Sequence, residues 1–386
     1  MVKPFNFARL PIIFFGPGKL KLLPDLVRKY GRNLLLVSDR KSFAESKYAG
    51  ELTGSLKEKD INLYHVTILG EPSPDLINTC VKKYSGTEIN VVAGIGGGSV
   101  LDTGKAISAM MYREENVRVF LEGVGDREHP GTKLPFIALP TTSGTGSEAT
   151  KNAVLSEVGK NGFKKSLRHD NFVPDIALVD PELTVSCPPS ITAASGMDCF
   201  TQLTEAFLSD KSNEYTDVLA WEGIKAVKFS LVRSYQDGED IEARTGMSFA
   251  ALTSGICLAN AGLGAVHGFA SSAGGIFSIP HGVLCGTLMA ASNKANVRAL
   301  RSNNTDVKAL SKYARLGRLF SRPDEFYIDA FLEYLEQLTD DLKLPRLSEY
   351  GIKEDDITVI CENTDIKNNP VKLTREQLME ILKERI

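Results

Sequence analysis

The 386-residue sequence predicts an α/β domain with a parallel sheet over residues 1–187 and an all-α domain over residues 188–386. In the first part, apolar runs of strand length alternate with helix-like segments, as they do in parallel α/β sheets. Beyond Pro188 the β-branched runs disappear and apolar residues recur at helical spacing. The chain is long enough for each part to have its own hydrophobic core.

The expected elements follow from these patterns in chain order. Strands are expected at residues 11–15, 33–39, 61–66, 89–93, 134–140 and 176–180, with helices over 20–30, over 75–84 and directly after Gly98. The continuous apolar run at 34–37 is typical of a strand buried on both faces. In the second part, helices are expected over 197–208, 213–232, 241–261, 306–319, 324–342 and 374–385. The last of them begins with a capping box of Thr374 and Gln377.

Charge and cysteine content exclude several classes of protein. With 45 basic and 48 acidic residues, the net charge of −3 predicts no nucleic-acid partner and no anionic membrane surface. The six cysteines form no CxxC pair, which argues against a disulfide framework or zinc knuckle and for the reducing cytoplasm. The first residues lack the layout of a signal peptide, and no apolar run is long enough for a membrane span.

The stretch from Val91 to Lys105 is the strongest local signal. A short β-branched run leads into four glycines among five residues, and an apolar-periodic helix follows. Glycine allows the backbone to approach a ligand closely, and the unpaired first amides of a helix attract phosphate. Gly97, Gly98 and Ser99 are therefore candidate phosphate-binding residues, with Asp102 and Lys105 close by. The alternative is a tight strand-to-helix turn that binds nothing.

Two further segments of the first part carry polar groups at predicted strand ends. Asp39 ends the second strand, where an acidic residue can hold the adenosine ribose and disfavour the extra phosphate of NADP. It could instead be a helix-capping residue. The segment 141–147 contains five hydroxyl side chains in seven residues directly after a buried strand, which favours a ligand over a solvated loop.

In the helical part, four polar residues form a candidate metal site. His267 and His281 lie in apolar, glycine-rich surroundings, and Asp198 and Gln202 lie one turn apart on one predicted helix. One carboxylate, two imidazoles and an amide oxygen suit a divalent transition metal. The alternative is that each histidine is a hydrogen-bonded core residue. His65, His129 and His169, which we place in surface or loop contexts, receive no role.

Taken together, motifs along nearly the whole chain resemble the iron-containing (group III) alcohol dehydrogenases, which include lactaldehyde reductase, propanediol dehydrogenase and butanol dehydrogenase. The resemblance implies a Rossmann-like α/β domain and an all-α domain, the two-domain architecture also found in dehydroquinate synthase. The matching segments are Phe15–Gly18, Asp39, Pro72–Pro74, Gly96–Lys105, Pro140–Glu148, Asp180–Thr184, Gly196–Asp198, His267–Gly268, Pro280–Gly282 and Asn369–Thr374.

The resemblance implies an NAD(P) cofactor in the first domain, with NADP the less favoured form because of Asp39. The pyrophosphate would lie on Gly97, Gly98 and Ser99, with Asp102 nearby. The other residues that match cofactor-contacting positions of the family are Thr141, Thr142, Thr145, Asn152, Lys164 and Leu183.

The resemblance also implies a divalent metal, Fe²⁺ or Zn²⁺, held by one Asp and three His of the helical domain. Asp198, His267 and His281 match three of these positions. Gln202 stands at the fourth, where its amide oxygen would be a weaker ligand than imidazole. Ser271 stands where the family has a His tied to proton transfer, so that step would need water, the cofactor ribose or a substrate hydroxyl.

The sequence therefore predicts a cytoplasmic, homodimeric, NAD(P)-dependent alcohol dehydrogenase or aldehyde reductase for a small alcohol or aldehyde. Hydride would pass to or from nicotinamide with the substrate oxygen on the metal held by Asp198, His267 and His281. One alternative is a metal-dependent lyase or cyclase of the dehydroquinate synthase type. That reaction needs a basic pocket, and the sequence shows no Lys/Arg cluster around Asp198 or His267. The other alternative, favoured only by Gln202 and Ser271, is a cofactor-binding homologue with altered or lost metal chemistry.

Overall fold

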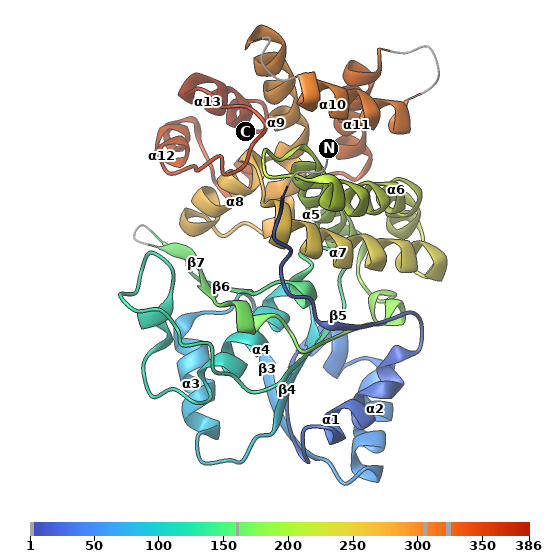
Figure 1. Cartoon of the computed structure of the whole chain (residues 1–386), viewed down its shortest axis with the longest axis vertical. Helices are drawn as coiled ribbons and strands as arrows, with labels where there is room; N and C mark the ends of the chain where they lie inside the picture. The colour runs from blue at the N-terminus through green and yellow to red at the C-terminus, as the bar shows by residue number, and fades with distance from the viewer. Residues whose placement is uncertain (1–3, 160–161, 304–306, 322–325) are drawn as a thin grey trace.

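The computed structural model describes residues 4–159, 162–303, 307–321 and 326–386. A sheet with helices on both faces forms one half of the molecule, and a bundle of helices forms the other (Figure 1). The prediction of an α/β part with a parallel sheet and a helical C-terminal part is confirmed. Six parallel strands pair in the order β1–β8–β5–β4–β2–β3. The strands are β1 (Ile12–Phe15), β2 (Asn33–Asp39), β3 (Asn62–Ile68), β4 (Val91–Gly96), β5 (Phe136–Pro140) and β8 (Ile176–Val179).

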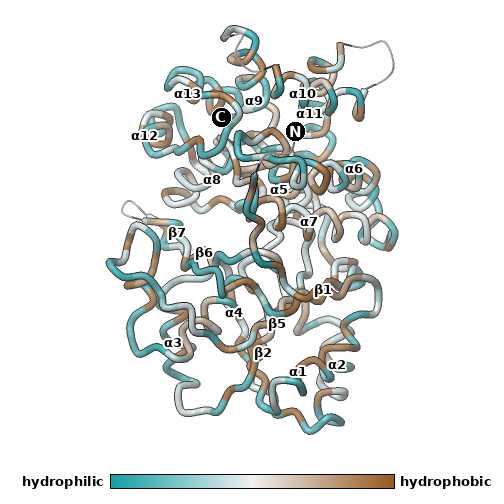
Figure 2. Tube along the Cα trace, in the orientation of Figure 1, coloured by the Kyte–Doolittle hydropathy of each residue, from teal (hydrophilic) through white to brown (hydrophobic). Residues whose placement is uncertain are grey.

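Alternation along the central strands produces a hydrophobic layer on each face of the sheet. Leu34 and Leu36 of β2 pack toward α1 (Leu23–Arg28) and α2 (Lys47–Glu58). Leu35 and Val37 pack on the other face, toward α3 (Pro74–Tyr84) and α4 (Gly98–Met110). In Figure 2, brown segments run through the centre of this half and teal covers much of its outer turns. Both faces are buried, as the apolar sequence of β2 predicts.

The strand order reverses between β2 and β4, because the chain adds β3 on one side of β2 and then β4 and β5 on the other. Asp39 ends β2 in register just beyond the pair Ser38–Ile95, so it lies beside the glycine loop that follows β4. In open parallel sheets, ligands bind outside the carboxyl ends of the strands at such a reversal. The topology thus brings Asp39 and the glycine loop together, although α2, β3 and α3 lie between them in the chain.

Helix α2 and a hairpin of two strands in the first half were not predicted. Strands β6 (Asn152–Glu157) and β7 (Phe163–Arg168) pair antiparallel and form a separate two-stranded sheet. Three of the six residues of β7 are basic, so the segment lacks the apolar alternation that identifies a strand from sequence. This hairpin packs against α4 and α8, and it carries Asn152 and Lys164 toward the helical half.

The helical half is organised around α5, which packs against α6, α7 and α9 and is buried over most of its length. Its helices are α5 (Pro189–Leu208), α6 (Glu214–Gln236), α7 (Ile241–Ala261), α8 (Ala265–Ile276), α9 (His281–Asn303), α10 (Val307–Phe320), α11 (Tyr327–Asp341), α12 (Ile357–Glu362) and α13 (Arg375–Lys383). The predicted bounds of α7 are confirmed, as is the capping box of α13. We did not predict α8, α9 or α12 individually. The helix starts expected at 306 and 324 lie outside the described residues.

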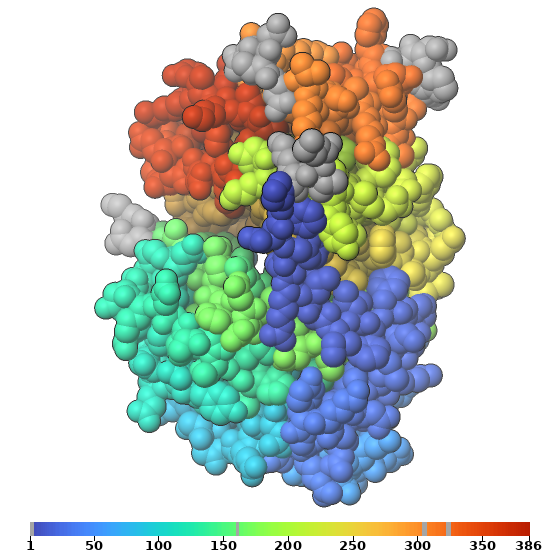
Figure 3. Space-filling model, in the orientation of Figure 1, coloured from blue at the N-terminus to red at the C-terminus, as the bar shows by residue number. Residues whose placement is uncertain are grey.

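The change from strands to helices falls between Val179 and Pro189, an interval that includes the proposed domain boundary after residue 187. The N-terminal segment nevertheless crosses to the helical half, as the dark blue residues in Figure 3 show. Phe5 and Phe7 pack on Tyr215 of α6, and the Ala8 amide donates to Asn260 of α7 at 2.6 Å. This segment therefore connects the two halves from outside.

Within the described ranges, no single helix is both long and apolar enough to span a membrane. Helices α7 and α8 reach that length and composition only when taken together, and a bend of 96° separates them.

The loops at the start of the chain and after β8 are joined by Asp180, which is buried. Its carboxylate accepts hydrogen bonds from the amides of Gly18 (3.1 Å), Leu20 (2.8 Å) and Glu182 (3.1 Å). We predict that Asp180→Ala lowers the free energy of unfolding by about 2–3 kcal/mol, because buried amides lose their acceptor. Urea denaturation measures this loss. The control is Asp126→Ala, whose side chain is 89% exposed, and an equal effect of the two variants would contradict the prediction.

Candidate metal centre and dinucleotide loop

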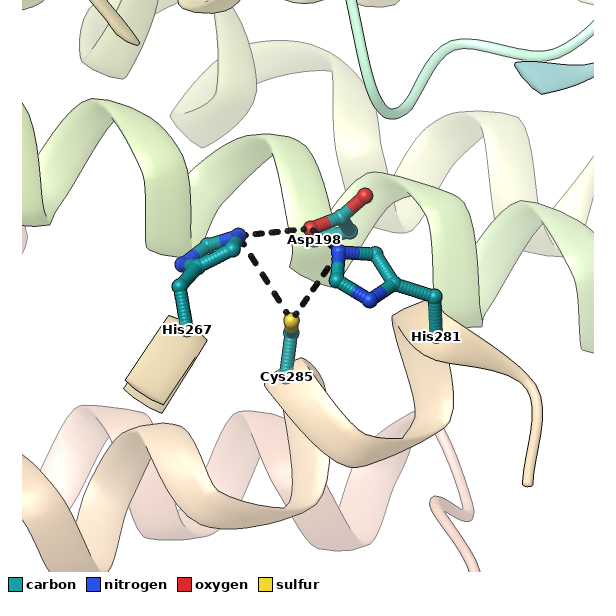
Figure 4. A group of neighbouring side chains, drawn as sticks. All are labelled: Asp198, His267, His281 and Cys285. Carbon is teal, nitrogen blue, oxygen red and sulfur yellow. Dashed lines mark hydrogen bonds and ion pairs between the residues drawn. The ribbon is translucent and has the colours of Figure 1, made fainter. Parts of the chain in front are cut away.

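Four side chains that are distant in sequence converge in the helical half (Figure 4). Asp198 comes from α5, His267 from α8, and His281 and Cys285 from the first turns of α9. One potential ligand atom from each lies within 4.8 Å of all the others. Asp198 Oδ1 is 3.2 Å from His267 Nε2 and 3.7 Å from His281 Nε2. The structure thus brings together three of the predicted metal ligands and adds a thiol.

Helix geometry explains why these side chains face one another. Asp198, Gln202 and Glu205 are spaced i, i+4 and i+7, so they share one face of α5, as the sequence spacing predicts. Gly282 allows α9 to start directly against that helix, since a Cβ at this position would lie 2.4 Å from the carbonyl oxygen of Ala194. The close approach holds His281 beside Asp198.

Glu205 fixes the orientation of the His267 ring. Its Oε2 lies 2.6 Å from His267 Nδ1, and its Oε1 accepts from the Val266 amide at 2.8 Å. A carboxylate that binds one ring nitrogen directs the other nitrogen to the metal and increases its basicity. His267 Nε2 accordingly points at Asp198. Glu205 was placed on this helix face by sequence but received no role there, because its partner lies 62 residues away.

The cluster holds both signs of charge before a metal binds. Burial lowers the pKa of His267, but the anionic groups around it raise that pKa well above its ordinary value, so the imidazole carries a proton that a metal would displace. Burial alone would raise the pKa of Asp198, but His281, His267 and the Gln202 amide bring it down to about 2, so the carboxylate is ionised. Burial lowers the pKa of His281 to about 4, which leaves a neutral imidazole able to act as a ligand. His281 Nδ1 is buried without a hydrogen-bond partner in the described structure. Burial raises the pKa of Cys285 to about 12, so without a metal it is a thiol.

Gln202 borders the cluster but faces another way. Its Oε1 lies 3.3 Å from Ser254 Oγ, and its amide donates to the Asp198 carboxylate. Its role as the fourth ligand stays a prediction. Sequence reasoning missed Cys285, although the spacing His281-x-x-x-Cys285 would have put both side chains on one helix face had α9 been predicted.

Two lysines lie beside this centre, although the sequence shows no basic cluster near Asp198 or His267. Lys367 Nζ donates to the carbonyl oxygen of His267 at 3.0 Å and lies 3.5 Å from Ser271 Oγ. Lys164 Nζ pairs with Glu71 at 2.6 Å and is close enough to His281 to lower its pKa further. Both reach the site from segments remote in sequence, so inspection of the residues around Asp198 and His267 does not reveal them.

One of the histidines outside the cluster is part of the hydrophobic core. His129, expected in a surface or loop context, lies in a loop but is buried between Phe120 and Phe172. This burial lowers the pKa of His129 to about 4, so the ring is a neutral side chain of the core.

The glycine loop and the hydroxyl-rich loop lie against each other at the ends of β4 and β5. Gly97 caps α4, and a Cβ on Gly98 would lie 2.9 Å from Thr145 Oγ1, so only glycine allows this approach. Thr142 lies next to Gly97, and Thr141 Oγ1 is 3.2 Å from Ser42 Oγ of the loop after β2. Gly97, Gly98, Ser99, Thr142 and Thr145 are all partly exposed. These residues form the region that we name the dinucleotide loop.

Other predicted cofactor residues have partners within the protein. Asp102 accepts from Ser147 Oγ at 2.6 Å and from the Val154 amide at 3.0 Å, so it ties α4 to the neighbouring loop and β6. Lys105 is 1% exposed and donates to the carbonyl oxygens of Ser147 and Asn152, so it does not reach a phosphate at the loop. Leu183 is buried in the core beside α1 and α2.

The Asp39 carboxylate accepts two hydrogen bonds from Ser42, one from its backbone amide at 2.6 Å and one from its hydroxyl. In the structure, Asp39 therefore caps the helical turn that follows β2, which is one of the two roles considered from sequence. A carboxylate has about four lone-pair sites, so Asp39 can still accept hydrogen bonds from a ribose.

Ser254 joins the two candidate sites. Its hydroxyl lies 3.3 Å from the carbonyl oxygen of Gly144 in the hydroxyl-rich loop and 3.3 Å from Gln202 Oε1 beside Asp198. Ser254 therefore lies between the hydroxyl-rich loop, which borders the dinucleotide loop, and Gln202, which borders the four-residue cluster.

Comparisons with known proteins agree with this arrangement. A family model described as iron-containing alcohol dehydrogenase matches residues 11–181, and one described as the Fe-containing alcohol dehydrogenase family, C-terminal, matches residues 192–386. The chain belongs to the iron-containing alcohol dehydrogenase family. The resemblance found from sequence motifs is thereby confirmed.

Relatives of this alcohol dehydrogenase family member cover its whole length. It is 32% identical to alcohol dehydrogenase 4 of Saccharomyces cerevisiae over 384 residues, or 97% of this chain and 96% of the yeast protein. It is 27% identical to the NAD-dependent methanol dehydrogenase of Bacillus methanolicus over 392 residues, or 98% and 99% of the two chains. The crystal structure of an archaeal halo-thermophilic alcohol dehydrogenase from a Red Sea brine pool is 25% identical, with a TM-score of 0.90 and coverage of 100% and 99%.

The position of Glu205 in this family member yields a test. We predict that Glu205→Gln weakens Zn²⁺ binding roughly 10- to 100-fold, the usual cost of losing the carboxylate partner of a metal-binding histidine. Competition with a chromophoric chelator measures the affinity. The matched control is Asp210→Asn, an exposed carboxylate two residues after α5. Unchanged affinity in Glu205→Gln would show that His267 is not oriented in this way.

Proposed function

We propose that this chain is an NAD(P)-dependent, metal-assisted alcohol dehydrogenase or aldehyde reductase that acts on a small alcohol or aldehyde. The observation that carries the proposal is the juxtaposition, through Ser254, of the dinucleotide loop and the Asp198–His267–His281 cluster. A hydride-transfer enzyme needs this arrangement, because the reacting carbon must lie between the nicotinamide and the group that polarises the oxygen. Family membership and the named relatives support the same class of reaction.

The residues of the cluster fit the metal that the family name implies. Asp198, His267 and His281 offer an anionic oxygen and two nitrogens, a donor set suited to Fe²⁺ or Zn²⁺. When bound, such an ion acts as a Lewis acid toward an alcohol or carbonyl oxygen. Nicotinamide, when bound at the dinucleotide loop, accepts or gives the hydride.

The protein positions these groups and keeps the site dry. Asp198 and His267 are nearly fully buried, so the negative charge of Asp198 acts in a medium of low dielectric constant. Glu205 holds the His267 ring in one tautomer and one orientation. Ser271 Oγ and Lys367 Nζ, 3.5 Å apart, are polar groups beside the cluster that can pass a proton where the family His is missing.

The two alternatives differ in what the structure offers them. Lys164 and Lys367 provide some of the positive charge that a lyase or cyclase of the dehydroquinate synthase type would need. The family match and the named relatives are nevertheless those of dehydrogenases, so a lyase is not favoured. A homologue with lost chemistry is not favoured either, because Cys285 restores a fourth donor to the cluster.

We further propose a cytoplasmic homodimer. All six cysteines are free in the described structure, which suits a reducing compartment. Strand β1 is an edge of the sheet, and Ile12 on it is 62% exposed. An uncovered apolar edge strand favours pairing with a second chain.

The role of the cluster is tested by His267→Ala. We predict that this change lowers kcat/KM with short alcohols by at least roughly 1000-fold, because the metal loses a ligand and substrate polarisation is lost. NADH affinity, measured by fluorescence, should stay nearly unchanged because His267 lies outside the dinucleotide loop. The control is His169→Ala, which removes a histidine whose ring accepts a hydrogen bond from the Asn171 amide and belongs to no part of the cluster. Full activity of His267→Ala would show that the metal assignment is wrong.

The preference for NAD over NADP is tested by Asp39→Asn. This change removes the negative charge at the end of β2 while asparagine can still cap the turn at Ser42. We predict that the ratio of kcat/KM for NADP⁺ to that for NAD⁺ rises roughly tenfold or more, because the 2′-phosphate is no longer repelled. The matched control is the exposed Asp60→Asn. An unchanged ratio would mean that Asp39 serves only as a cap.

A further inference from the structure

The metal cluster contains a donor that the sequence motifs do not supply. We propose that Cys285 Sγ, rather than the Gln202 amide oxygen, is the fourth protein ligand of the metal. The resulting Asp–His–His–Cys donor set would favour Zn²⁺ over Fe²⁺. This inference rests on the proposed function only in assuming that a divalent ion binds at this cluster.

The distances between donor atoms carry the proposal. Tetrahedral Zn²⁺, with bonds of about 2.0–2.1 Å to nitrogen or oxygen and about 2.3 Å to sulfur, puts its N/O donors roughly 3.3 Å apart and sulfur roughly 3.6 Å from nitrogen. Cys285 Sγ lies 3.6 Å from His267 Nε2 and 3.7 Å from His281 Nε2. Asp198 Oδ1 lies 3.2 and 3.7 Å from the same nitrogens. Four edges of the donor tetrahedron are thus already close to their values around an ion.

Gln202 is held in a different position by its own partners. Its amide oxygen, the atom that would bind a metal, lies 3.3 Å from Ser254 Oγ, whose single hydroxyl proton is closer to the Ala251 carbonyl oxygen at 2.8 Å. Its amide nitrogen donates to Asp198. With its amide nitrogen on Asp198 and its oxygen beside Ser254, Gln202 supports the Asp198 carboxylate from outside the cluster.

Cys285 has the surroundings of a ligand rather than of a reactive surface thiol. It is fully buried, and within the described residues its Sγ makes polar contacts with the two histidine nitrogens that face the cluster. His281 and Cys285 lie in the first turns of α9, and Cys285 packs in the apolar core of the helical half. When a divalent ion binds, the S–H bond breaks, a sulfur–metal bond forms and one proton passes to the solvent.

The donor type determines the choice of metal. Thiolate is a softer ligand than carboxylate, amide or imidazole, and it stabilises Zn²⁺ more than it stabilises a hard ferrous centre of mixed N and O ligands. Replacing an imidazole on α5 by a thiolate on α9 would therefore change which metal is retained while leaving the number of protein donors unchanged.

Cobalt substitution tests the ligand directly. We load the full-length apoprotein with Co²⁺ and record the near-ultraviolet absorption, where a thiolate ligand gives a charge-transfer band. The band should appear in the wild type and in Gln202→Ala, and it should be absent from Cys285→Ser. Cys80→Ser, a buried cysteine of α3 in the sheet half, is the matched control and should keep the band. A wild type without the band, or a Cys285→Ser variant that keeps it, overturns the proposal.

Metal affinity gives a second readout. Cys285→Ser should weaken Zn²⁺ binding by more than the roughly 10- to 100-fold loss expected for an outer hydrogen-bond partner, and it should lower the ratio of Zn²⁺ to Fe²⁺ affinity. Gln202→Ala should change that ratio little. The opposite pattern, with metal lost from Gln202→Ala and kept by Cys285→Ser, would make Gln202 the ligand.

A measurement on the wild type alone covers the case in which Cys285→Ser does not fold. X-ray absorption of the Zn²⁺-loaded protein should show one sulfur neighbour at about 2.3 Å. A zinc environment of nitrogen and oxygen alone would overturn the proposal. Absence of alcohol oxidation with NAD⁺ would instead contradict the proposed function, while the cobalt and zinc spectra would still decide the ligand set.

Discussion

The buried charge of Asp198 is the constraint on which the rest of the site depends. It is 1% exposed in the middle of α5, a helix whose surroundings are otherwise apolar. An ionised carboxylate in such a place is costly unless it is paired and hydrogen-bonded. The two histidines and the Gln202 amide surround it, and a divalent cation among the same donors would neutralise it further. Helix α9, which packs against α5, and helix α8, which packs against α9, supply these histidines.

The same helix also couples the metal centre to the sheet. Gln202 and Ser254 connect the Asp198 turn to the loop after β5, and Gly144 packs so closely on Ser195 of α5 that a Cβ there would lie 2.9 Å from the serine side chain. The nucleotide half and the metal half thus meet through close backbone packing as well as through the Ser254 side chain. Such contacts fix the distance between the two sites, which a hydride-transfer reaction requires.

Prediction from sequence succeeded where a local pattern determines the structure. The apolar run of β2, the glycine loop and the capping box at Thr374 each depend on neighbouring residues, and each was found. The spacing of Asp198 and Glu205 likewise revealed their shared helix face. What could not be predicted depends on contacts between distant segments. Examples are the pairing of Glu205 with His267 and the hydrogen bond from Lys367 to the His267 carbonyl oxygen. The hydrogen bond from Lys105 to the Ser147 carbonyl oxygen is another. The basic, polar strand β7 was missed because its fold comes from its partner and not from its own periodicity.

The exchange of the expected fourth histidine for Gln202 has a physical explanation in this framework. A histidine at that position would add a donor on the α5 side of the cluster, whereas the glutamine lies beside Ser254 and donates to Asp198. The thiol of Cys285 approaches from the α9 side, where His281 already faces the cluster. The metal can therefore keep four protein donors when α9 supplies the ligand that α5 lacks. Coordination depends on the positions of the donor atoms and not on the helix that carries them. Conversely, a family motif that loses a ligand position does not by itself show that the metal is lost.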